Sequence, residues 1–361
     1  MAYKSRKRGN SVTVKDVARE AGVSVGSVSH TFNSHDNVTD EIKQRVLQAA
    51  AKLGYVRSGS QGLSAEKKSR TLKEIGFLYC GSLEASSVAE NPFWSRILQG
   101  AENAAREATL KINYCDITNL VQDPQALVRT IEELHLEGIL LVGAVDAETV
   151  RVVKNLNLPL VLVDNYVRGM AVDSVLCNNF EGARMAVEYL ISEGHRQIAF
   201  IGGPLLPAPH PLNQVYTLEH RAAGYRTALY EAGLEVNDAL FETSHLLTQS
   251  AYEACQRLLA RQVPFTAIFC ANDSIAIGAM KALREAGLAL PDDVSLVGFD
   301  DIDMVEHLTP ALTTVHVHKE ALGTIAIKVL LGRVADPDAI SQTCLLEVEL
   351  VKRQSVACCH I

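Results

Sequence analysis

The sequence has little of what would mark a membrane, secreted or metal-binding protein. Across its 361 residues no apolar run reaches the roughly 20 residues that span a bilayer, and its N-terminus lacks the apolar region of a signal peptide. The eight cysteines are dispersed without a C-x-x-C spacing, which opposes zinc and disulfide roles. No phosphate-cradling glycine loop is present. We therefore expect a cytoplasmic protein with no cofactor, no metal and no membrane partner.

Basic residues, by contrast, are concentrated at the start of the chain. The first 73 residues hold 14 Lys and Arg against 6 Asp and Glu, whereas the remainder holds 20 against 36. A basic head on an acidic body is typical of a nucleic-acid-binding module joined to a solvated effector domain. The arm at residues 4–8 alone would be equally typical of a solvated tail.

The stretch GVSVGSVSHTFN at residues 22–33 admits two interpretations. Its G-x-S-x-G pattern would make Ser24 a hydrolase nucleophile, but that turn needs a buried strand before it. The preceding TVKDVAREA instead has the apolar spacing of a helix. Thr13 and Asp16 have the spacing of a capping box, which predicts a helix from about Val14 to Gly22. We do not expect an enzyme.

Ser24 can then cap a second helix, and a third is expected after Thr39. Two helices joined by a glycine-containing turn and supported by a third form a helix-turn-helix, although a generic solvated three-helix cap is the alternative. Serine hydroxyls can bind phosphates, Val25 a thymine methyl and His30 a base edge. The residues predicted to contact double-stranded DNA in this head are Thr13, Ser24, Val25, Gly26, Ser27, Ser29, His30 and Asn33.

The body of the chain alternates short apolar runs such as GILLVGA and VSLVGFD with amphipathic segments. This pattern predicts an α/β fold with two doubly wound parallel-sheet subdomains behind the all-α head. We expect the head at 1–57 and a linker or hinge at 58–73. The first subdomain is expected at 74–165 and about 317–335, and the second at 166–316 and about 336–361.

Ligands of doubly wound sheets bind at the carboxyl ends of strands, and several polar or aromatic residues fall at such positions. Carboxylates, amides and an arginine suit the fixed hydroxyls of a sugar, and aromatic rings suit its C–H faces. We therefore expect a small-molecule effector, with a small carbohydrate favoured over a purine. The predicted effector-binding residues are Asn91, Phe93, Trp94, Asp164, Asn165, Arg221, Asn272, Asp273 and Asp300.

Some of these residues have a structural alternative. Asp273 could be only a helix cap, and Trp94 could belong to the core. The cluster of Asp300, Asp301 and Asp303 resembles a set of hard-cation ligands. No second oxygen-rich stretch supports a metal there.

Head and body together resemble the LacI/GalR (lactose-repressor) family of bacterial transcription regulators, from about Val12 to Val356. The resemblance implies a homodimeric, nucleoid-associated repressor that binds a pseudo-palindromic operator. It also implies a periplasmic-binding-protein-like core that senses the effector. By position Val25, Gly26 and His30 match base-reading residues of the family, and seven of the predicted effector residues match its effector contacts. The resemblance rests on VTVKDVAREAGVSVGSVSHTFN, GHRQIAFIGGP, CANDSIAIGAM, PDDVSLVGFDD, TPALTTVHVHKEALG and LVKRQS.

Three features depart from the family pattern. Family members form a hinge helix that wedges a leucine into the minor groove, whereas here Gly59 and Gly62 interrupt that segment and Leu63, the predicted wedge, lies one place early. The insertion LLPAPHPLNQVYTLEH lies between Pro204 and Arg221. Where many sugar-binding members have glutamine, this chain has Val317.

The ending has no heptad extension, so a dimer is expected rather than a tetramer. Other classes stay open at this point: a purine-type co-repressor-dependent regulator, a cytosolic solute-binding protein without operator function, or a sugar-processing enzyme. The basic head opposes the solute-binding protein, and the lack of a nucleophile or acid/base set opposes the enzyme. The sequence does not fix whether the effector is an inducer or a co-repressor.

Overall fold

The structure is a computed structural model of the chain. It describes residues 13–32, 42, 43, 45, 46, 49, 72–81, 88, 91–203 and 215–359, except the side chains of Lys15, Ser29, His30 and Phe32. The chain divides into two compact units, Met1–Lys68 and Ser69–Ile361. We call them the head and the core and describe each by itself.

The described part of the head contains two short helices in the predicted places, α1 (Val14–Ala21) and α2 (Val25–Phe32). The Thr13 N–H donates to the carboxylate of Asp16 over 2.9 Å, which is half of the predicted capping box. Gly22 ends α1 in the left-handed conformation, with φ of 65°, which glycine adopts without steric cost. The sequence therefore predicted both ends of α1 correctly.

A small apolar cluster holds the head together. Arg45 also donates to the carbonyl of Ala21 over 2.7 Å, which satisfies an orphan acceptor at the end of α1. Of the expected third helix, residues 42, 43, 45, 46 and 49 are described, and all are helical. The buried residues of the cluster are Val17, Ala18, Ala21, Val28, Val46 and Ala49.

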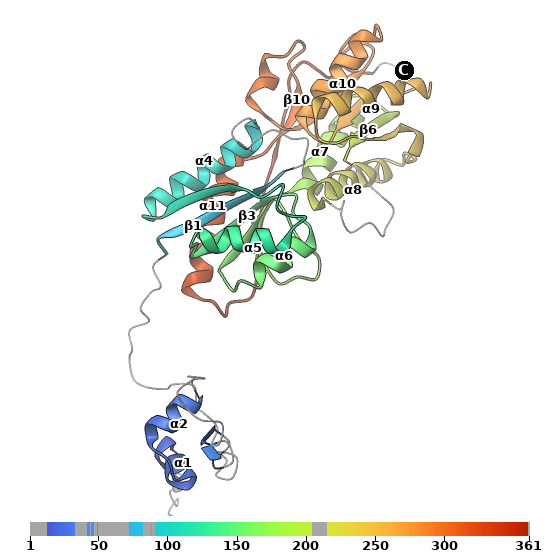
Figure 1. The fold of residues 1–361 in the computed structure, drawn as a ribbon. Coiled ribbons are helices and arrows are strands. Elements are labelled where there is room, and N and C mark those ends of the chain that lie inside the picture. The colour runs from blue at the N-terminus through green and yellow to red at the C-terminus, as the bar shows by residue number, and fades with distance from the viewer. Residues whose placement is uncertain are drawn as a thin grey trace, which may run out of the picture. The chain divides into compact units, whose positions relative to one another are not determined.

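The first sheet of the core is parallel and has the order β11-β5-β4-β3-β1-β2. Every residue of β3 is buried, because helices cover both faces of the sheet (Figure 1). Leu140 belongs to the cluster that includes α4 and Leu141 to the one that includes α5 and α6. The strands are β1 (Glu74–Cys80), β2 (Lys111–Asp116), β3 (Gly138–Gly143), β4 (Leu160–Val163), β5 (Asp173–Cys177) and β11 (Thr343–Leu346), and the helices are α4 (Pro92–Glu107), α5 (Pro124–Glu133), α6 (Ala147–Lys154) and α11 (Lys319–Ala335).

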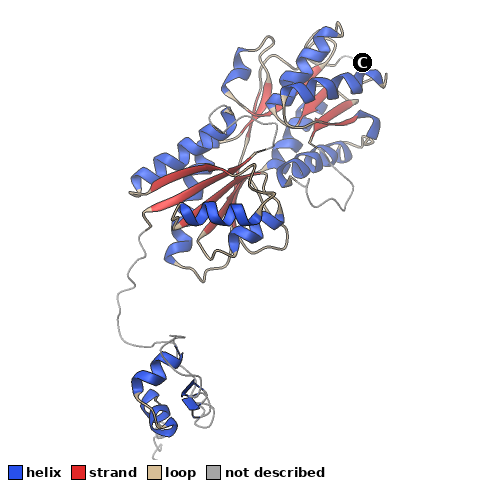
Figure 2. Ribbon diagram, in the orientation of Figure 1, coloured by secondary structure: helices blue, strands red, loops and turns tan. Residues whose placement is uncertain are grey.

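The second sheet has the order β12-β10-β9-β8-β6-β7, and only β12 runs antiparallel to its neighbour among the described strands. Helices lie on both sides of it (Figure 2), with α7 packed on α8 and α9 on α10. None of the described helices has the length and apolar character to cross a bilayer. The elements are α7 (Asn179–Ser192), β6 (Ile198–Gly202), α8 (Tyr216–Glu231), η1 (Asp238–Leu240), β7 (Phe241–Thr243), α9 (Thr248–Ala260), β8 (Ala267–Cys270), α10 (Asp273–Glu285), β9 (Ser295–Asp300), η2 (Asp303–His307), β10 (Thr313–His316) and β12 (Glu349–Val351).

The α/β class with two parallel-sheet subdomains is confirmed, but two predicted boundaries are wrong. The first subdomain does not end at Asn165, because β5 pairs with β4 and extends the first sheet. The segment after residue 336 is not all in the second subdomain, because β11 pairs with β5. The chain therefore crosses between subdomains after β5, between β10 and α11, and between β11 and β12.

The helices α4 and α11 touch backbone to backbone at two glycines. A Cβ on Gly100 would lie 2.0 Å from the carbonyl oxygen of Glu320, and one on Gly323 would lie 2.0 Å from that of Ile97. Only glycine fits at such a separation. This contact fixes the middle of α4 against the start of α11, where the chain crosses between the subdomains.

Candidate functional site

The N-terminus of α2 presents small side chains on the surface of the head. Ser24, Val25 and Gly26 are exposed, and Val25 keeps 46% of its surface accessible. The Ser24 Oγ accepts the N–H of Ser27 over 3.0 Å, so this serine caps α2 as expected. Ser24 follows a helix rather than a strand, which is not the context of a hydrolase nucleophile.

The other predicted DNA contacts are described only in part. The Thr13 hydroxyl donates to Asp16 over 2.6 Å, which leaves its oxygen as an acceptor. Ser29 and His30 lie in α2, but their side chains are outside the described set. Asn33 and Leu63 lie outside the described residues, as do Gly59, Gly62 and most of the insertion after Pro204.

A cavity of about 400 Å³ lies between the two subdomains, and we call it the central cavity. Several of its polar residues follow or end β4, β8 and β9, as expected for ligand sites in doubly wound sheets, and others come from α8 and from the start of α4. Seven of the nine predicted effector residues line it: Asn91, Phe93, Trp94, Asp164, Arg221, Asn272 and Asp300.

Arg221, on α8, is buried at the centre of this lining. Its Nε donates to the Oδ1 of Asn179 over 2.7 Å, and its guanidinium carbon lies 3.7 Å from the centroid of the Phe299 ring. Its NH2 atom forms an ion pair with Asp300 over 3.1 Å. These contacts hold the guanidinium in one orientation, which gives a bound polar ligand a fixed donor.

Two buried carboxylates face the central cavity from the ends of β4 and β9. Asp164 and Asp300 adopt φ angles of 53° and 105°, conformations that are uncommon outside glycine and are typical of functional sites. The Oδ1 of Asp164 is buried without a hydrogen-bond partner among the described residues. Burial raises the pKa of Asp164 to about 7. Burial also raises the pKa of Asp300, against the opposing effect of Arg221 and Lys319.

Two asparagines add amide groups to the same cavity. The Oδ1 of Asn91 accepts the N–H of Trp94 over 3.3 Å, and the Oδ1 of Asn272 accepts that of Ile275 over 2.8 Å. Each asparagine therefore caps a helix and is held rigidly. Within the described part of the chain, neither amide nitrogen has an acceptor, so both can donate to a ligand.

Aromatic rings form the apolar part of the lining. The ring centroid of Trp94 lies 4.9 Å from that of Phe93, nearly edge to face, and 5.6 Å from that of Tyr79. All three residues line the central cavity. The cavity thus combines an apolar face with carboxylate acceptors and amide and guanidinium donors, which is the usual make-up of a small-molecule site.

Two predicted effector residues do not line the central cavity. Asp273 is the first residue of α10, and its carboxylate accepts from the Thr314 hydroxyl over 2.6 Å and from the Ile302 N–H over 2.9 Å. Asp273 thus connects the end of β8 to the end of β9 and to β10 inside the second subdomain. Asn165 donates to the carbonyl of Val145 and lines a neighbouring cavity instead.

The sequence prediction missed several polar residues of the lining. Thr217 lies one turn before Arg221 on α8, so helical spacing could have found it. Ser244 follows the three-residue strand β7, which the apolar pattern did not reveal. The lining polar residues that were missed are Tyr79, Thr217, Ser244, His245 and Ser274.

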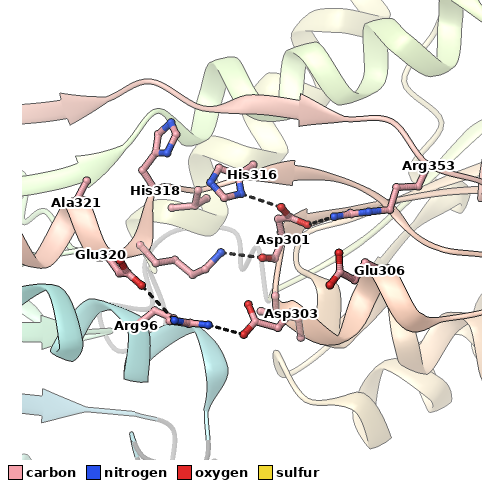
Figure 3. Close-up of a pocket in the computed structure, with 12 residues that line it drawn as sticks. Arg96, Asp301, Asp303, Glu306, His316, His318, Glu320, Ala321 and Arg353 are labelled. Carbon is pink, nitrogen blue, oxygen red and sulfur yellow. Dashed lines mark hydrogen bonds and ion pairs between the residues drawn. The ribbon is translucent and has the colours of Figure 1, made fainter.

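A third, charged pocket of about 510 Å³ lies where β10 crosses into α11, and we call it the crossover pocket (Figure 3). Asp301 accepts from His316 over 2.8 Å and pairs with Arg353 over 2.7 Å. Arg96 on α4 pairs with Asp303 over 2.7 Å, joining the two subdomains. The three aspartates that resembled cation ligands thus have separate cationic partners.

Comparison with known proteins identifies the family. Residues 13–58 match the model of the bacterial regulatory proteins of the lacI family, and residues 187–356 match a periplasmic-binding-protein-like domain. The repressor PurR of Erwinia tasmaniensis is 34% identical over 348 residues, which are 96% of this chain and 97% of that protein. The chain belongs to the lacI family of bacterial regulatory proteins.

Two further proteins are similar to this chain over nearly its whole length. The ribose operon repressor of Haemophilus influenzae is 31% identical over 344 residues, 95% of this chain and 98% of that protein. The lac repressor dimer bound to operator and the anti-inducer ONPF has a TM-score of 0.68 at 26% identity, covering 96% of this chain and 100% of that one. As a lacI family protein, the chain is a DNA-binding repressor.

Proposed function

We propose that the protein is a homodimeric, cytoplasmic repressor whose affinity for a pseudo-palindromic operator is set by a carbohydrate bound in the central cavity. The N-terminus of α2 reads the operator, and the two subdomains close on the sugar. The lac repressor structure is named as a dimer bound to operator, and two relatives are named ribose operon repressors. Both names support the proposal.

The Oδ1 of Asp164, which is buried without a hydrogen-bond partner among the described residues, is the observation that carries the carbohydrate assignment. A buried acceptor without a donor costs free energy, and a sugar hydroxyl supplies that donor. Arg221 and the two amide nitrogens of Asn91 and Asn272 supply donors to the other hydroxyl oxygens. The ring faces of Phe93 and Trp94 suit the C–H surface of a sugar.

The ligand must discriminate between two arrangements of the core to act on DNA. A sugar that bridges the subdomains can change operator affinity only through different affinities for the DNA-competent and DNA-incompetent states. Weaker operator binding with sugar identifies an inducer, and stronger binding identifies a co-repressor.

A thermal-shift screen of the full-length protein against pentoses, hexoses, disaccharides and purines tests the proposal, because a ligand of the native state raises its apparent stability. We expect a hit among the sugars that Asp164→Asn abolishes, and a change in operator affinity when that sugar is added. Hits confined to purines, or sugar binding that leaves operator affinity unchanged, would contradict it.

A further inference from the structure

A second cavity of about 480 Å³ lies beside the central cavity, and we call it the adjoining cavity. The two cavities share four lining residues, Cys80, Gly81, Ala144 and Val215. They therefore lie on either side of one short wall. A ligand that fills the central cavity and is longer than one ring would extend over this wall.

Two tyrosines from different subdomains line the adjoining cavity. Tyr166 follows β4 in the first subdomain, and Tyr216 opens α8 in the second. Their ring centroids are 4.9 Å apart with the planes tilted by 47°. A second link, the ion pair of Arg168 with Glu219 at 2.7 Å, joins the same two segments. The cavity is thus completed only by both subdomains together.

Some polar groups of the adjoining cavity are already committed to the backbone. The Asn165 side chain donates to the carbonyl of Val145 over 2.7 Å and accepts the N–H of Tyr166 over 2.8 Å. The Thr118 hydroxyl oxygen accepts the N–H of Gly81 over 2.9 Å. These contacts fix the part of the cavity lining that positions Tyr166.

Other polar groups have no such commitment. Among the described residues, the hydroxyls of Tyr166 and Tyr216 and the side-chain amide of Gln122 have no hydrogen-bond partner, and all three residues line the cavity. The adjoining cavity therefore offers aromatic faces and neutral donors and acceptors beside the charged side chains of Asp146, Arg168 and Glu219.

We infer that the effector is a two-ring carbohydrate, a disaccharide or a glycoside of similar length. Its first ring occupies the central cavity against Asp164, Arg221 and Asp300, and its second ring lies on Tyr166 and Tyr216. A sugar ring presents both a C–H face for the tyrosine rings and hydroxyls for their free oxygens. This inference rests on the proposed function, because it assigns the length of the ligand in a site already taken as a sugar site.

The two tyrosines also explain how the longer ligand would change the arrangement of the two subdomains. Because Tyr166 and Tyr216 belong to different subdomains, a second ring that lies across both tyrosines has its full contact only when the subdomains are closed on each other. The disaccharide therefore favours the closed arrangement more strongly than its single-ring component does.

Isothermal titration of the full-length protein with D-glucose, D-galactose, cellobiose, maltose and lactose tests the inference. We expect at least one disaccharide to bind tenfold or more tightly than its own monosaccharides. Tyr216→Leu and Tyr166→Leu should each weaken that disaccharide about tenfold and change monosaccharide affinity less than twofold. Tyr230→Leu, at an 81% exposed tyrosine on the same helix as Tyr216, is the matched control and should change neither.

The outcomes separate the two proposals. Monosaccharide binding without any disaccharide preference overturns the two-ring inference and leaves the proposed function standing. A disaccharide preference that both tyrosine variants retain, or a loss that affects both ligand lengths equally, overturns the placement of the second ring. Failure of these five sugars and of every sugar in the thermal-shift screen to bind the unmodified protein overturns the proposed function together with the inference.

Discussion

The Nζ of Lys319 donates to the carbonyl oxygen of Asp300 over 2.6 Å, so a lysine at the start of α11 holds the residue whose carboxylate faces the central cavity. The same Nζ donates to the carbonyl of Asp301 over 2.8 Å. Both aspartates have positive φ angles, of 105° and 52°, which neighbouring contacts must stabilise. Lys319 thus connects the crossover between the subdomains to the central cavity without lining that cavity.

Replacing this lysine should weaken effector binding from a distance. Lys319→Met removes both donors, which leaves two carbonyls unpaired and lets the strained turn relax, at a cost of about 1–3 kcal/mol in unfolding free energy. We expect effector affinity to fall about tenfold by titration, with the fold retained by circular dichroism. Lys328→Met, at an exposed lysine on the same helix, is the control. Unchanged affinity in the folded Lys319→Met protein would show that Asp300 needs no such support.

The pH dependence of stability should report on Asp164. Its pKa is raised to about 7 in the native state by burial, from 3.8 in the unfolded chain. The native state therefore binds more protons than the unfolded chain between about pH 4 and pH 7, and stability falls as pH rises through that window. Asp164→Asn removes this titration.

We expect the variant to gain stability relative to the parent protein as pH rises from 5 to 8, by on the order of 1–3 kcal/mol. Urea unfolding without ligand at the two pH values measures the difference. Burial raises the pKa of Asp273 to about 8, so this residue should contribute part of the pH dependence of stability in both proteins. A stability difference that stays constant across this range would show that Asp164 is ionised throughout. The same variant should lose effector affinity, since function and stability conflict at this residue.

The backbone contact between α4 and α11 should be intolerant of a single methyl group. Gly323→Ala places a Cβ 2.0 Å from the carbonyl oxygen of Ile97, and we expect a loss of about 1–3 kcal/mol or more in unfolding free energy. Gly332→Ala on the same helix has no neighbour within 4 Å and should add up to about 1 kcal/mol, as alanine is the better helix former. Urea titration of both variants checks the contrast, and equal effects would mean that the helices separate readily.

The sequence predicts the layers of this fold better than it predicts where the chain changes subdomain. Long apolar runs such as Gly138–Gly143 are unambiguous, because every residue of a covered parallel strand is buried. Strand β7 is only three residues long, and β11 alternates exposed and half-buried residues, so neither has a strong pattern. The crossovers depend on which sheet such short strands join, and that is decided by pairing between distant segments.

The same distinction applies to the candidate site. Residues at the ends of strong strands, such as Asp164 and Asp300, were found because the topology places those ends together. Asp273 was misplaced, since the first turn of α10 directs its carboxylate to Thr314 instead of the central cavity. Tyr166 and Tyr216 are fifty positions apart, and no local pattern brings their rings to 4.9 Å.

Substitutions at two valines of α2 should distinguish recognition of the DNA sequence from stability of the head. Val25 is exposed at the first position of the helix, whereas Val28 is fully buried among α1 and the third-helix residues. Val25→Ala removes methyl groups that can contact a thymine, so we expect a loss of about 1 kcal/mol at the selected operator and a smaller loss at sites changed at one base pair. Val28→Ala leaves a void in a small core and should destabilise the head.

Fluorescence anisotropy with an operator selected from a randomised duplex pool, and with a set of its single-base variants, measures both effects. Val28→Ala should weaken binding to all of these duplexes by a similar factor, because fewer heads are folded at any moment. Val25→Ala should change the ranking of the duplexes, because only the base pair that meets its side chain is affected. If Val25→Ala lowers affinity for every duplex equally, the first position of α2 positions the helix without reading a base, and the reading must come from residues later in the helix.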